Sequence, residues 1–238
     1  MKRFYKQAQA VQNGDVYEVQ LDGRSVKLPE SKAPLSMPVR GLAEAIAAEW
    51  DAQEGAVVPD SMPLMQIAST CQDKVSKLRA AMHDQLMKYV DTDLLFYRTD
   101  NPPDLRTLQE TAWDPVLDEF ETRYGVRPIV TDGLVALSQP QALHDVIDDI
   151  LSKLPDEAFT VAQIAVPASG SLITGILFTL GALDAERVLS ICRVEERHKD
   201  GIYDADKYGQ DPSIEKADKA MMQDLQACRQ YLDLLAAE

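Results

Sequence analysis

Two turn signals near the start of the chain limit its fold more than any other feature. Asn13-Gly14 lies between RFYKQAQAVQ and VYEVQL, and Asp22-Gly23 lies between VYEVQL and RSVKL. Both central residues of a type I′ hairpin turn have positive φ, which Asn, Asp and Gly tolerate best. These signals predict a three-stranded antiparallel meander in the first part of the chain.

The spacing of apolar residues becomes helical after the meander. Leu42, Ile46 and Trp50 lie four residues apart, and steps of three and four continue over residues 64–89. The first set predicts a short helix, and the second predicts a long one with room for a bend midway. Asn101-Pro102-Pro103 should end this region, because a residue before proline avoids helical backbone angles.

The rest of the chain has helical spacing apart from one expected hairpin. VRPIV and LVAL flank Thr131-Asp132-Gly133, which predicts a small hairpin near residues 126–137. The fold class is therefore α+β. A small antiparallel β-rich N-terminal domain, residues 1–59, is followed by a larger, mostly helical C-terminal domain, residues 60–238.

Composition restricts the class of function. The 238 residues carry a formal net charge of −15, which opposes binding to nucleic acid and to anionic membranes. No apolar run reaches the roughly 18 residues that a membrane span needs. Cys71, Cys192 and Cys228 are widely spaced, which indicates buried thiols in a reducing compartment and does not suit a zinc site.

Acidic residues are concentrated in the middle of the chain. Residues 91–157 contain fifteen Asp and Glu against five Lys and Arg, a surplus of ten negative charges. Such a surplus is usually a solvated surface, but it can also steer a basic partner. Aromatic residues in the same region, Tyr97 and Trp113 among them, belong either to the core or to a groove for another chain.

YVDTDLLFYR contains two aspartates, Asp91 and Asp93, with two possible roles. Two carboxylates can hold a magnesium ion, which prefers oxygen ligands. However, the sequence supplies no Gly-rich phosphate loop beside them. Asp91 or Thr92 would also suit the cap of a new helical turn, and this structural role is the one that the sequence favours.

Trp113-Asp114-Pro115 has the pattern of a helix start. Asp114 would cap the helix, Pro115 would occupy its first position, and Trp113 would pack against the first turn. The functional alternative is that Trp113 is an exposed aromatic anchor for a partner.

Catalytic arrangements are not apparent. His83, His144 and His198 are scattered and have no identifiable triad partner. Ser169-Gly170-Ser171 lacks the second glycine of a Gly-x-Ser-x-Gly elbow and is predicted to cap a helix. The sequence therefore predicts a protein that is not an enzyme and needs no cofactor.

Six motifs occur in an order that matches a known family. They are RFYK, LDGR at 21–24, LAEAIAAEWDAQ at 42–53, SMPLMQIASTCQD at 61–73, YVDTDLLFYR with Gln109 and WDPVLD, and Gly170-Ser171 with the helix through Glu195-Glu196. In order and spacing they resemble the ATP synthase assembly chaperones that bind the alpha subunit of the catalytic head.

This resemblance implies a non-enzymatic chaperone that keeps the unassembled alpha subunit soluble until the beta subunit replaces it. The resemblance also implies that an acidic residue in the family's Asp-Glu pair near the C-terminus is important, and Glu195 and Glu196 match that pair. We therefore expect a monomer without metal that does not insert into membranes. The residues expected to contact the partner are Glu195, Glu196, Trp113, Asp114, Asp93 and Tyr97.

The end of the match departs from the family pattern. Lys199 stands near the family's Gln, and Tyr208-Gly209-Gln210-Asp211 stands where relatives have Trp-Gly-x-Asp. The chain starts at the family's first motif without a mitochondrial presequence, so a bacterial cytoplasmic protein is expected, whereas eukaryotic relatives act in the mitochondrial matrix. Two other classes stay open: a metal-dependent hydrolase using Asp91 and Asp93, and a scaffold with another client.

Overall fold

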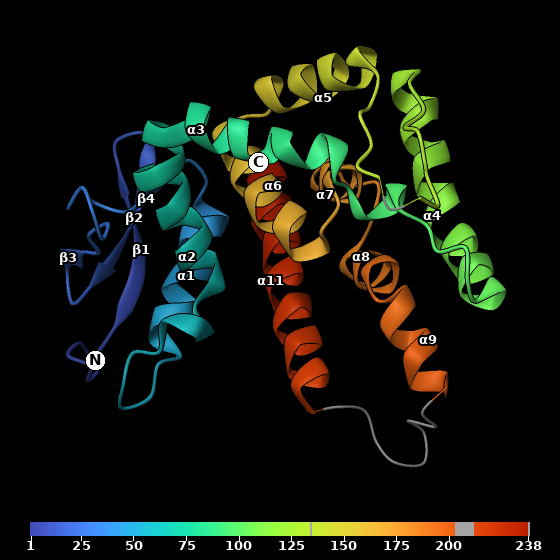
Figure 1. Ribbon diagram of the computed structural model, residues 1–238. Helices are drawn as coiled ribbons and strands as arrows, with labels where there is room; N and C mark the ends of the chain where they lie inside the picture. The colour runs from blue at the N-terminus through green and yellow to red at the C-terminus, as the bar shows by residue number, and fades with distance from the viewer. Residues whose placement is uncertain (134, 203–211, 238) are drawn as a thin grey trace. The chain divides into compact units, whose positions relative to one another are not determined.

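The protein consists of a small antiparallel sheet followed by helices, which confirms the predicted α+β class (Figure 1). The computed structural model describes residues 1–133, 135–202 and 212–237. The chain forms two compact units. The N-terminal unit is Met1–Arg79 with Pro155–Val161 and Gln226–Glu238, and the second unit is Ala80–Leu154 with Ala162–Leu225. A domain boundary near residue 59 stays a prediction.

The sheet contains the predicted meander and one additional short strand. Strands β1 (Ala8–Asn13), β2 (Val16–Leu21) and β3 (Arg24–Ser25) pair in this order, and β4 (Ser36–Met37) also pairs with β2. All pairings are antiparallel. The central strand β2 therefore organises the sheet.

The two hairpin turns differ in type. Asn13 pairs with Val16, so the first turn has Gly14 at its first central position, with φ of 64°. This geometry fits a type II′ turn and corrects the expected type I′ turn. The second turn has positive φ at both Asp22, 47°, and Gly23, 80°, as a type I′ turn requires.

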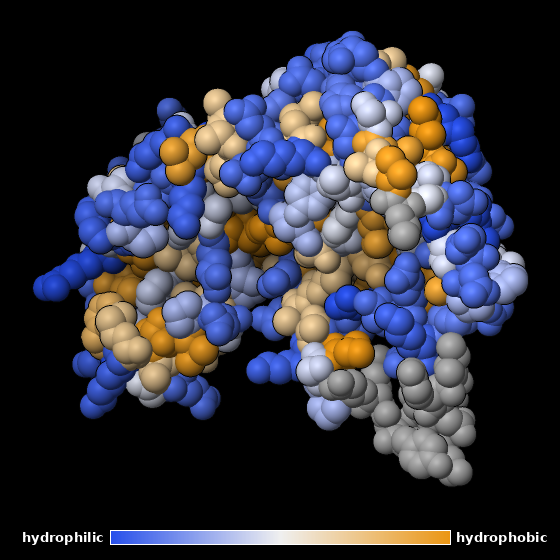
Figure 2. Space-filling model, in the orientation of Figure 1, coloured by the Kyte–Doolittle hydropathy of each residue, from blue (hydrophilic) through white to orange (hydrophobic). Residues whose placement is uncertain are grey.

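Helix α1 (Arg40–Asp51) packs against β1 and β2 and buries the predicted residues Leu42, Ile46 and Trp50. Burying such side chains stabilises the unit by about 1.5–3 kcal/mol each. Apolar surface nevertheless stays exposed near the N-terminus (Figure 2), where Met1 is 75% and Phe4 is 65% exposed. This exposed surface borders a groove in the N-terminal unit.

The long helix predicted over residues 64–89 is interrupted. It consists of α2 (Pro63–Thr70), a π-helical turn η2 (Cys71–Val75) and α3 (Ser76–Met87), and it follows the short η1 (Pro59–Ser61). A π-helical turn adds a residue, so it rotates the apolar stripe of the segment that follows. Leu78, which the spacing placed on the buried face, is consequently 54% exposed.

The second unit begins with two short turns and one long helix. Turns η3 (Lys88–Asp91) and η4 (Leu94–Phe96) precede α4 (Pro103–Tyr124), which starts directly after Pro102. Pro115 lies inside α4, so the expected helix start at Trp113-Asp114-Pro115 was wrong. Pro115 costs the helix a backbone hydrogen bond, and we attribute its tolerance to the burial of Trp113, Val116, Leu117 and Phe120 on the same helix.

The segment predicted as a hairpin, residues 126–137, has a different arrangement. In its described part, which omits residue 134, the structure contains no β-strand. Instead, Thr131 forms a parallel bridge with Tyr97. The Thr131 N–H donates to the carbonyl of Phe96, and the Arg98 N–H donates to the carbonyl of Thr131. The segment thus pairs with the chain after η4.

The remaining helices confirm the helical spacing predicted for the rest of the chain. They are α5 (Gln141–Lys153), α6 (Asp156–Ser169), α7 (Leu172–Thr179), α8 (Ala185–Cys192), α9 (Val194–Ile202) and α11 (Pro212–Ala236). Ser171 caps α7 by accepting the Thr174 N–H, which confirms its predicted role. None of the helices in the described part of the chain combines the length and the apolarity of a membrane span. The departing motif Tyr208-Gly209-Gln210-Asp211 lies outside the described residues.

Candidate functional site

Asp93 is a buried structural cap. Its side chain has no exposed surface. Oδ1 accepts the Leu95 N–H at 2.9 Å, and Oδ2 accepts the Ile173 N–H at 2.9 Å. One carboxylate therefore caps η4 and also holds the first turn of α7. The cap expected in this stretch exists, and it is Asp93 rather than Asp91 or Thr92 that provides it.

Burial and hydrogen bonding act on Asp93 in opposite directions. Desolvation raises its pKa to about 6, although hydrogen bonds from Ile173, Leu95 and Ser171 favour the charged form. A carboxylate with this pKa is still mainly charged at neutral pH. We expect it to position other residues, because it cannot touch a partner in this conformation.

Asp91 and Asp93 have different partners, which weakens the metal-dependent alternative. Asp91 Oδ1 accepts the Gln139 N–H at 2.8 Å and lies 3.2 Å from His144 Nε2. The oxygens of Asp93 instead accept hydrogen bonds from the backbone N–H groups of Leu95 and Ile173. Among the described residues, no three His, Cys, Asp or Glu side chains are grouped as a metal site would need. The pair does not form the carboxylate cluster that a hydrolase would use.

Trp113 belongs to the core of the second unit. It is fully buried, and its Nε1 donates to the Ile191 carbonyl at 2.8 Å. Ile191 lies in the last turn of α8, where carbonyls lack partners within the helix. Trp113 therefore fastens α4 to the end of α8, and its indole is not exposed as an anchor for a partner.

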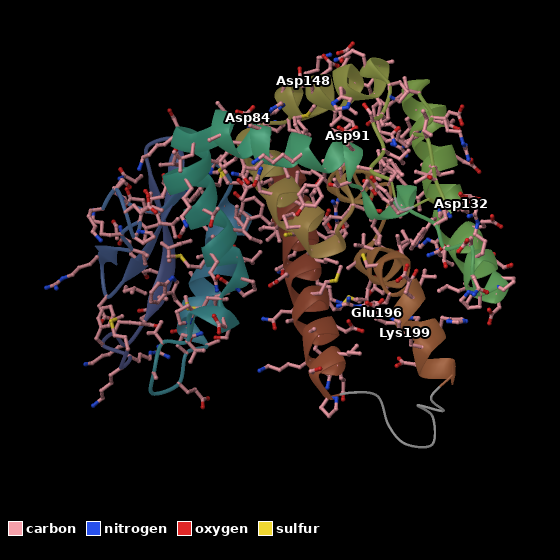
Figure 3. The ribbon with its side chains drawn as sticks, viewed as in Figure 1. Asp84, Asp91, Asp132, Asp148, Glu196 and Lys199 are labelled. Atoms are coloured by element: carbon pink, nitrogen blue, oxygen red, sulfur yellow. The ribbon has the colours of Figure 1, made fainter. Side chains whose placement is uncertain are left out.

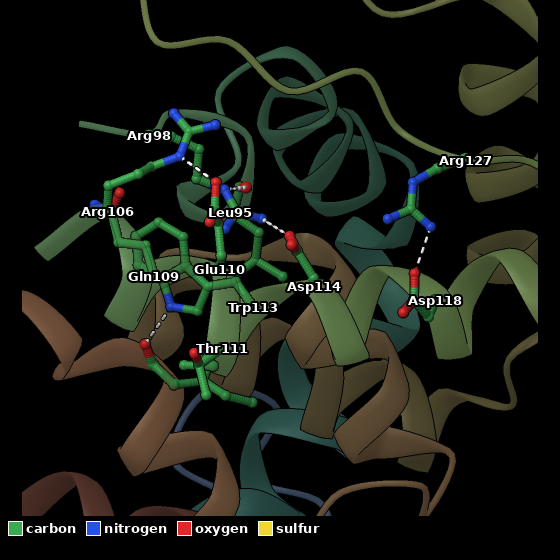
Figure 4. A network of polar contacts seen from close by, with 12 residues as sticks. Leu95, Arg98, Arg106, Gln109, Glu110, Thr111, Trp113, Asp114, Asp118 and Arg127 are labelled. Carbon is green, nitrogen blue, oxygen red and sulfur yellow. Dashed lines mark hydrogen bonds and ion pairs between the residues drawn. The ribbon is translucent and has the colours of Figure 1, made fainter. Parts of the chain in front are cut away.

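Arg98 and Asp114 form an ion pair beside Trp113 (Figure 4). The Arg98 side chain is 1% exposed, and its guanidinium lies 4.9 Å from the centre of the Trp113 ring. Nη2 donates to Asp114 at 2.8 Å, and Nε donates to the Leu95 carbonyl. Burial lowers the pKa of Arg98, and Asp114 opposes this shift. Asp114 is 44% exposed, so its outer side can face a partner.

The predicted acidic pair divides into one held and one freer carboxylate. Glu195 accepts a hydrogen bond from Nε2 of the fully buried Gln109 at 3.0 Å. Glu196 lies 3.8 Å from Arg193, is 34% exposed, and shares that arginine with Asp218. Glu195 therefore ties α9 to α4, and Glu196 is better placed to contact another molecule.

Tyr97 is half-buried and holds two segments together. Its hydroxyl donates to the Asp91 carbonyl at 2.7 Å and accepts the Leu137 N–H at 3.1 Å. Both hydrogen-bonding roles of the hydroxyl are thus used within the second unit. Its structural role is clear, and partner contact at Tyr97 stays a prediction.

The acidic surplus is distributed over several elements. Figure 3 shows Asp84 on α3, Asp91 on η3, Asp148 on α5 and Asp132 in the loop after α4. Many of the carboxylates of α4 have arginine partners, including Asp118 and Glu121, which both contact Arg127 (Figure 4 shows the Asp118 pair). The acidic side chains of the second unit therefore come from several elements, and many of those on α4 are paired with arginines.

Two polar residues at this site were not identified by sequence patterns. Arg98 and Gln109 are both buried and hydrogen-bonded, yet neither has a characteristic spacing. Both residues belong to the family motif YVDTDLLFYR with Gln109, and only the resemblance drew attention to them. A buried arginine or glutamine has no local signature, because its partners come from distant segments of the chain.

Comparison with known proteins agrees with the fold and the motifs. A model of the ATP12 chaperone protein family matches residues 2–121. Mitochondrial protein atp12 of Schizosaccharomyces pombe is 29% identical over 213 residues, which cover 83% of this chain and 72% of that protein.

Two solved structures of Atp12 from Paracoccus denitrificans, one of them an aspartate-to-lysine variant, are similar to the chain over 98% of its length and 97% of theirs. Each has a TM-score of 0.86 and 28% identity. The chain therefore belongs to the ATP12 chaperone family, the ATP synthase assembly chaperones that its sequence motifs indicated.

Proposed function

We propose that this protein binds the unassembled alpha subunit of F1-ATPase and keeps it soluble until the beta subunit takes its place. The observation that carries the proposal is the match of the whole fold to Atp12 together with the family motifs. An unpaired subunit exposes apolar interface and aggregates. A protein that covers this surface lowers the free concentration of the aggregating species by mass action and needs no nucleotide.

The contact surface that we propose lies on the second unit, where α4 and α9 pack together. Its exposed acidic side chains include Asp114 and Glu196, which are 44% and 34% exposed. Partly exposed charges at the rim of an interface mainly set the rate and specificity of binding, and they leave the partner replaceable. Replaceability is what a transient chaperone requires.

The buried members of the predicted set support this surface indirectly. Asp93 and Trp113 fix η4, α7 and α8, and Gln109 fixes Glu195. Substituting them should weaken client binding through loss of structure. Substituting Glu196 should weaken binding while the folded state keeps its stability, whereas loss of Asp114 would also leave the buried Arg98 without its ion-pair partner and lower the stability.

The decisive experiment compares Glu196→Lys with Glu186→Lys. Glu186 is exposed on α8 of the same unit, so both variants change the net charge equally. Light scattering by purified alpha subunit would be measured against chaperone concentration, alongside the melting temperature. Glu196→Lys should need about tenfold more chaperone to halve aggregation, equivalent to ~1.4 kcal/mol of binding. Equal protection by the two variants would refute the role of Glu196.

A pull-down from a bacterial lysate tests the identity of the client. The alpha subunit should be the main protein recovered. A different main partner would favour the scaffold alternative. Size-exclusion chromatography of the pure protein should give a monomer, and we place its action in the bacterial cytoplasm.

A further inference from the structure

The N-terminal unit contains a groove that the proposed function does not use. Its cavity volume is about 960 Å³, near the upper end of the range of about 300–1,000 Å³ for small-ligand sites. We call it the N-terminal groove. Its apolar walls and rim include Met1, Phe4, Tyr5, Trp50, Met62 and Met65.

The lining suits a variable apolar segment. Three of the six named residues are methionines, whose flexible and polarizable side chains adapt to ligands of different shape. Phe4, 65% exposed, and Met1, 75% exposed, extend the apolar surface beyond the groove. Exposed apolar surface of this kind is typical of binding sites.

Unpaired positive charges surround the groove. Arg24, Lys27 and Lys74 line it, are exposed, and have no side-chain hydrogen bond or ion pair within the described part of the chain. The groove is therefore lined by these unpaired positive charges, although the whole protein has a net charge of −15.

The two carboxylates of the groove are already engaged by backbone groups. Asp22 accepts the N–H groups of Lys6 and Gln7. Asp73 is 1% exposed and accepts the N–H groups of Glu30 and Ser31 at 2.7 and 3.1 Å. Burial opposes ionisation of Asp73, but a hydrogen bond from the Ser31 side chain, these N–H groups and the charge of Lys77 lower its pKa to about 2. The charges left for an occupant are therefore the three cations.

We propose that the N-terminal groove binds an extended apolar segment of the client polypeptide that is flanked by Asp or Glu. The apolar centre of the segment would cover the methionines, and its carboxylates would pair with Arg24, Lys27 and Lys74. This inference rests on the proposed chaperone function and gives the protein a second client contact, opposite in charge to the acidic surface on α4 and α9.

The test uses a synthetic peptide of roughly ten residues, ~33 Å when extended. It has a Leu, Val and Ala centre with two acidic residues at each end, and a second peptide has lysines at those ends. Binding is measured by fluorescence polarization at low and high salt. The acidic peptide should bind about tenfold more tightly than the lysine peptide at low salt, and the difference should shrink as salt screens the charges.

Two charge-reversal variants locate the binding. One carries Arg24→Glu, Lys27→Glu and Lys74→Glu, and the matched control changes three exposed lysines of the second unit, Lys88, Lys153 and Lys216, to Glu. Only the first variant should lose the preference for the acidic peptide. Phe4→Ser should weaken both peptides several-fold, whereas Val135→Ser, at an 81% exposed position in the second unit, should not.

Trp50 provides a direct readout in the unaltered protein. The chain has two tryptophans, so its NMR spectrum contains two indole N–H signals. Trp113 Nε1 is hydrogen-bonded to Ile191, whereas Trp50 Nε1, in a residue that lines the groove, has no acceptor within the described residues. The peptide should shift the Trp50 signal and leave the Trp113 signal unchanged.

The outcomes separate this inference from the proposed function. If neither peptide binds, if the Arg24, Lys27 and Lys74 variant binds like its control, or if only a fatty acid such as laurate shifts the Trp50 signal, the inference is overturned. Protection of the alpha subunit that still depends on Glu196 would then leave the proposed function intact. Peptide binding without protection of the alpha subunit would instead refute the proposed function.

Discussion

Replacing Asp93 tests how one buried carboxylate is balanced between two opposing effects. Burial favours its protonated form, whereas N–H groups of η4 and α7 stabilise its charge. Burial prevails, because the pKa of Asp93 is raised to about 6. The unfolded-state value is roughly 3.9. The native state therefore binds a proton more readily than the unfolded state between these two values.

The sign of the pH effect follows from this difference. A raised carboxyl pKa adds stability below roughly pH 4, and this stability is lost as the pH rises through about 6. The full difference of about two pH units corresponds to ~3 kcal/mol. Between pH 7 and pH 5 the contribution of Asp93 to the free energy of unfolding should grow by about 1.4 kcal/mol.

Two variants isolate this contribution. Asp93→Asn and Asp93→Ser both remove the titrating group, and they differ in how well they replace its hydrogen bonds to Leu95 and Ile173. A buried N–H left without an acceptor costs about 1–3 kcal/mol, and this cost does not depend on pH. The two variants should therefore differ from each other by a constant amount. Both should differ from the unaltered protein by an amount that grows as the pH falls.

Urea unfolding followed by circular dichroism, at several pH values from 5 to 8, measures these differences. Titration of other groups is common to all three proteins and cancels. A difference that stays constant over this range would refute the dominance of burial. A difference that shrinks toward pH 5 would show that the hydrogen bonds to Asp93 outweigh desolvation.

The packing of the chain leads to three other predictions. In Gly175→Ala the new Cβ would lie 2.9 Å from the Val166 backbone nitrogen, so we expect a loss of about 1–3 kcal/mol in the free energy of unfolding. In Gly41→Ala the new Cβ would make only an ordinary contact with the Leu234 side chain at 3.7 Å, so this control should be neutral or slightly stabilising, and thermal melts compare the two variants. Trp113→Phe removes the hydrogen bond to the end of α8 and should cost about 1–3 kcal/mol in urea unfolding, and an unchanged midpoint would contradict this role. Burial raises the pKa of Cys192 to about 12, so very little of this thiol is ionised at pH 8. In the folded protein its reaction with Ellman's reagent should be on the order of a thousandfold slower than that of a free thiol. Rapid labelling of Cys192 in the native protein would disprove the burial.

Local signals in the sequence were sufficient where neighbours along the chain decide the structure. Asp22-Gly23 specified a turn that only residues tolerant of positive φ can form. The spacing of Leu42, Ile46 and Trp50 identified α1 and its buried face. Ser171 was correctly predicted as a cap, because the donor it binds lies three residues away.

Tertiary contacts decided the features that local signals predicted incorrectly. Pro115 was expected to start a helix and lies inside one, and we attribute this to the burial of neighbouring apolar residues on α4. Thr131 pairs with Tyr97 rather than within a hairpin. Leu78 was expected in the core, but the π-helical turn before it rotates it to the surface.

The candidate site shows the same division. The sequence by itself identified the family motifs and the absence of a nucleophile elbow, because these depend on residue type and spacing, and the resemblance carried by those motifs indicated the acidic pair. Only the tertiary structure distinguished Glu195, held by Gln109, from the freer Glu196, and showed that Asp93 is enclosed. Whether a carboxylate faces water or an N–H donor depends on its distant neighbours, which for Glu195 and the Gln109 side chain lie 86 residues apart, and no local pattern in the sequence encodes such a contact.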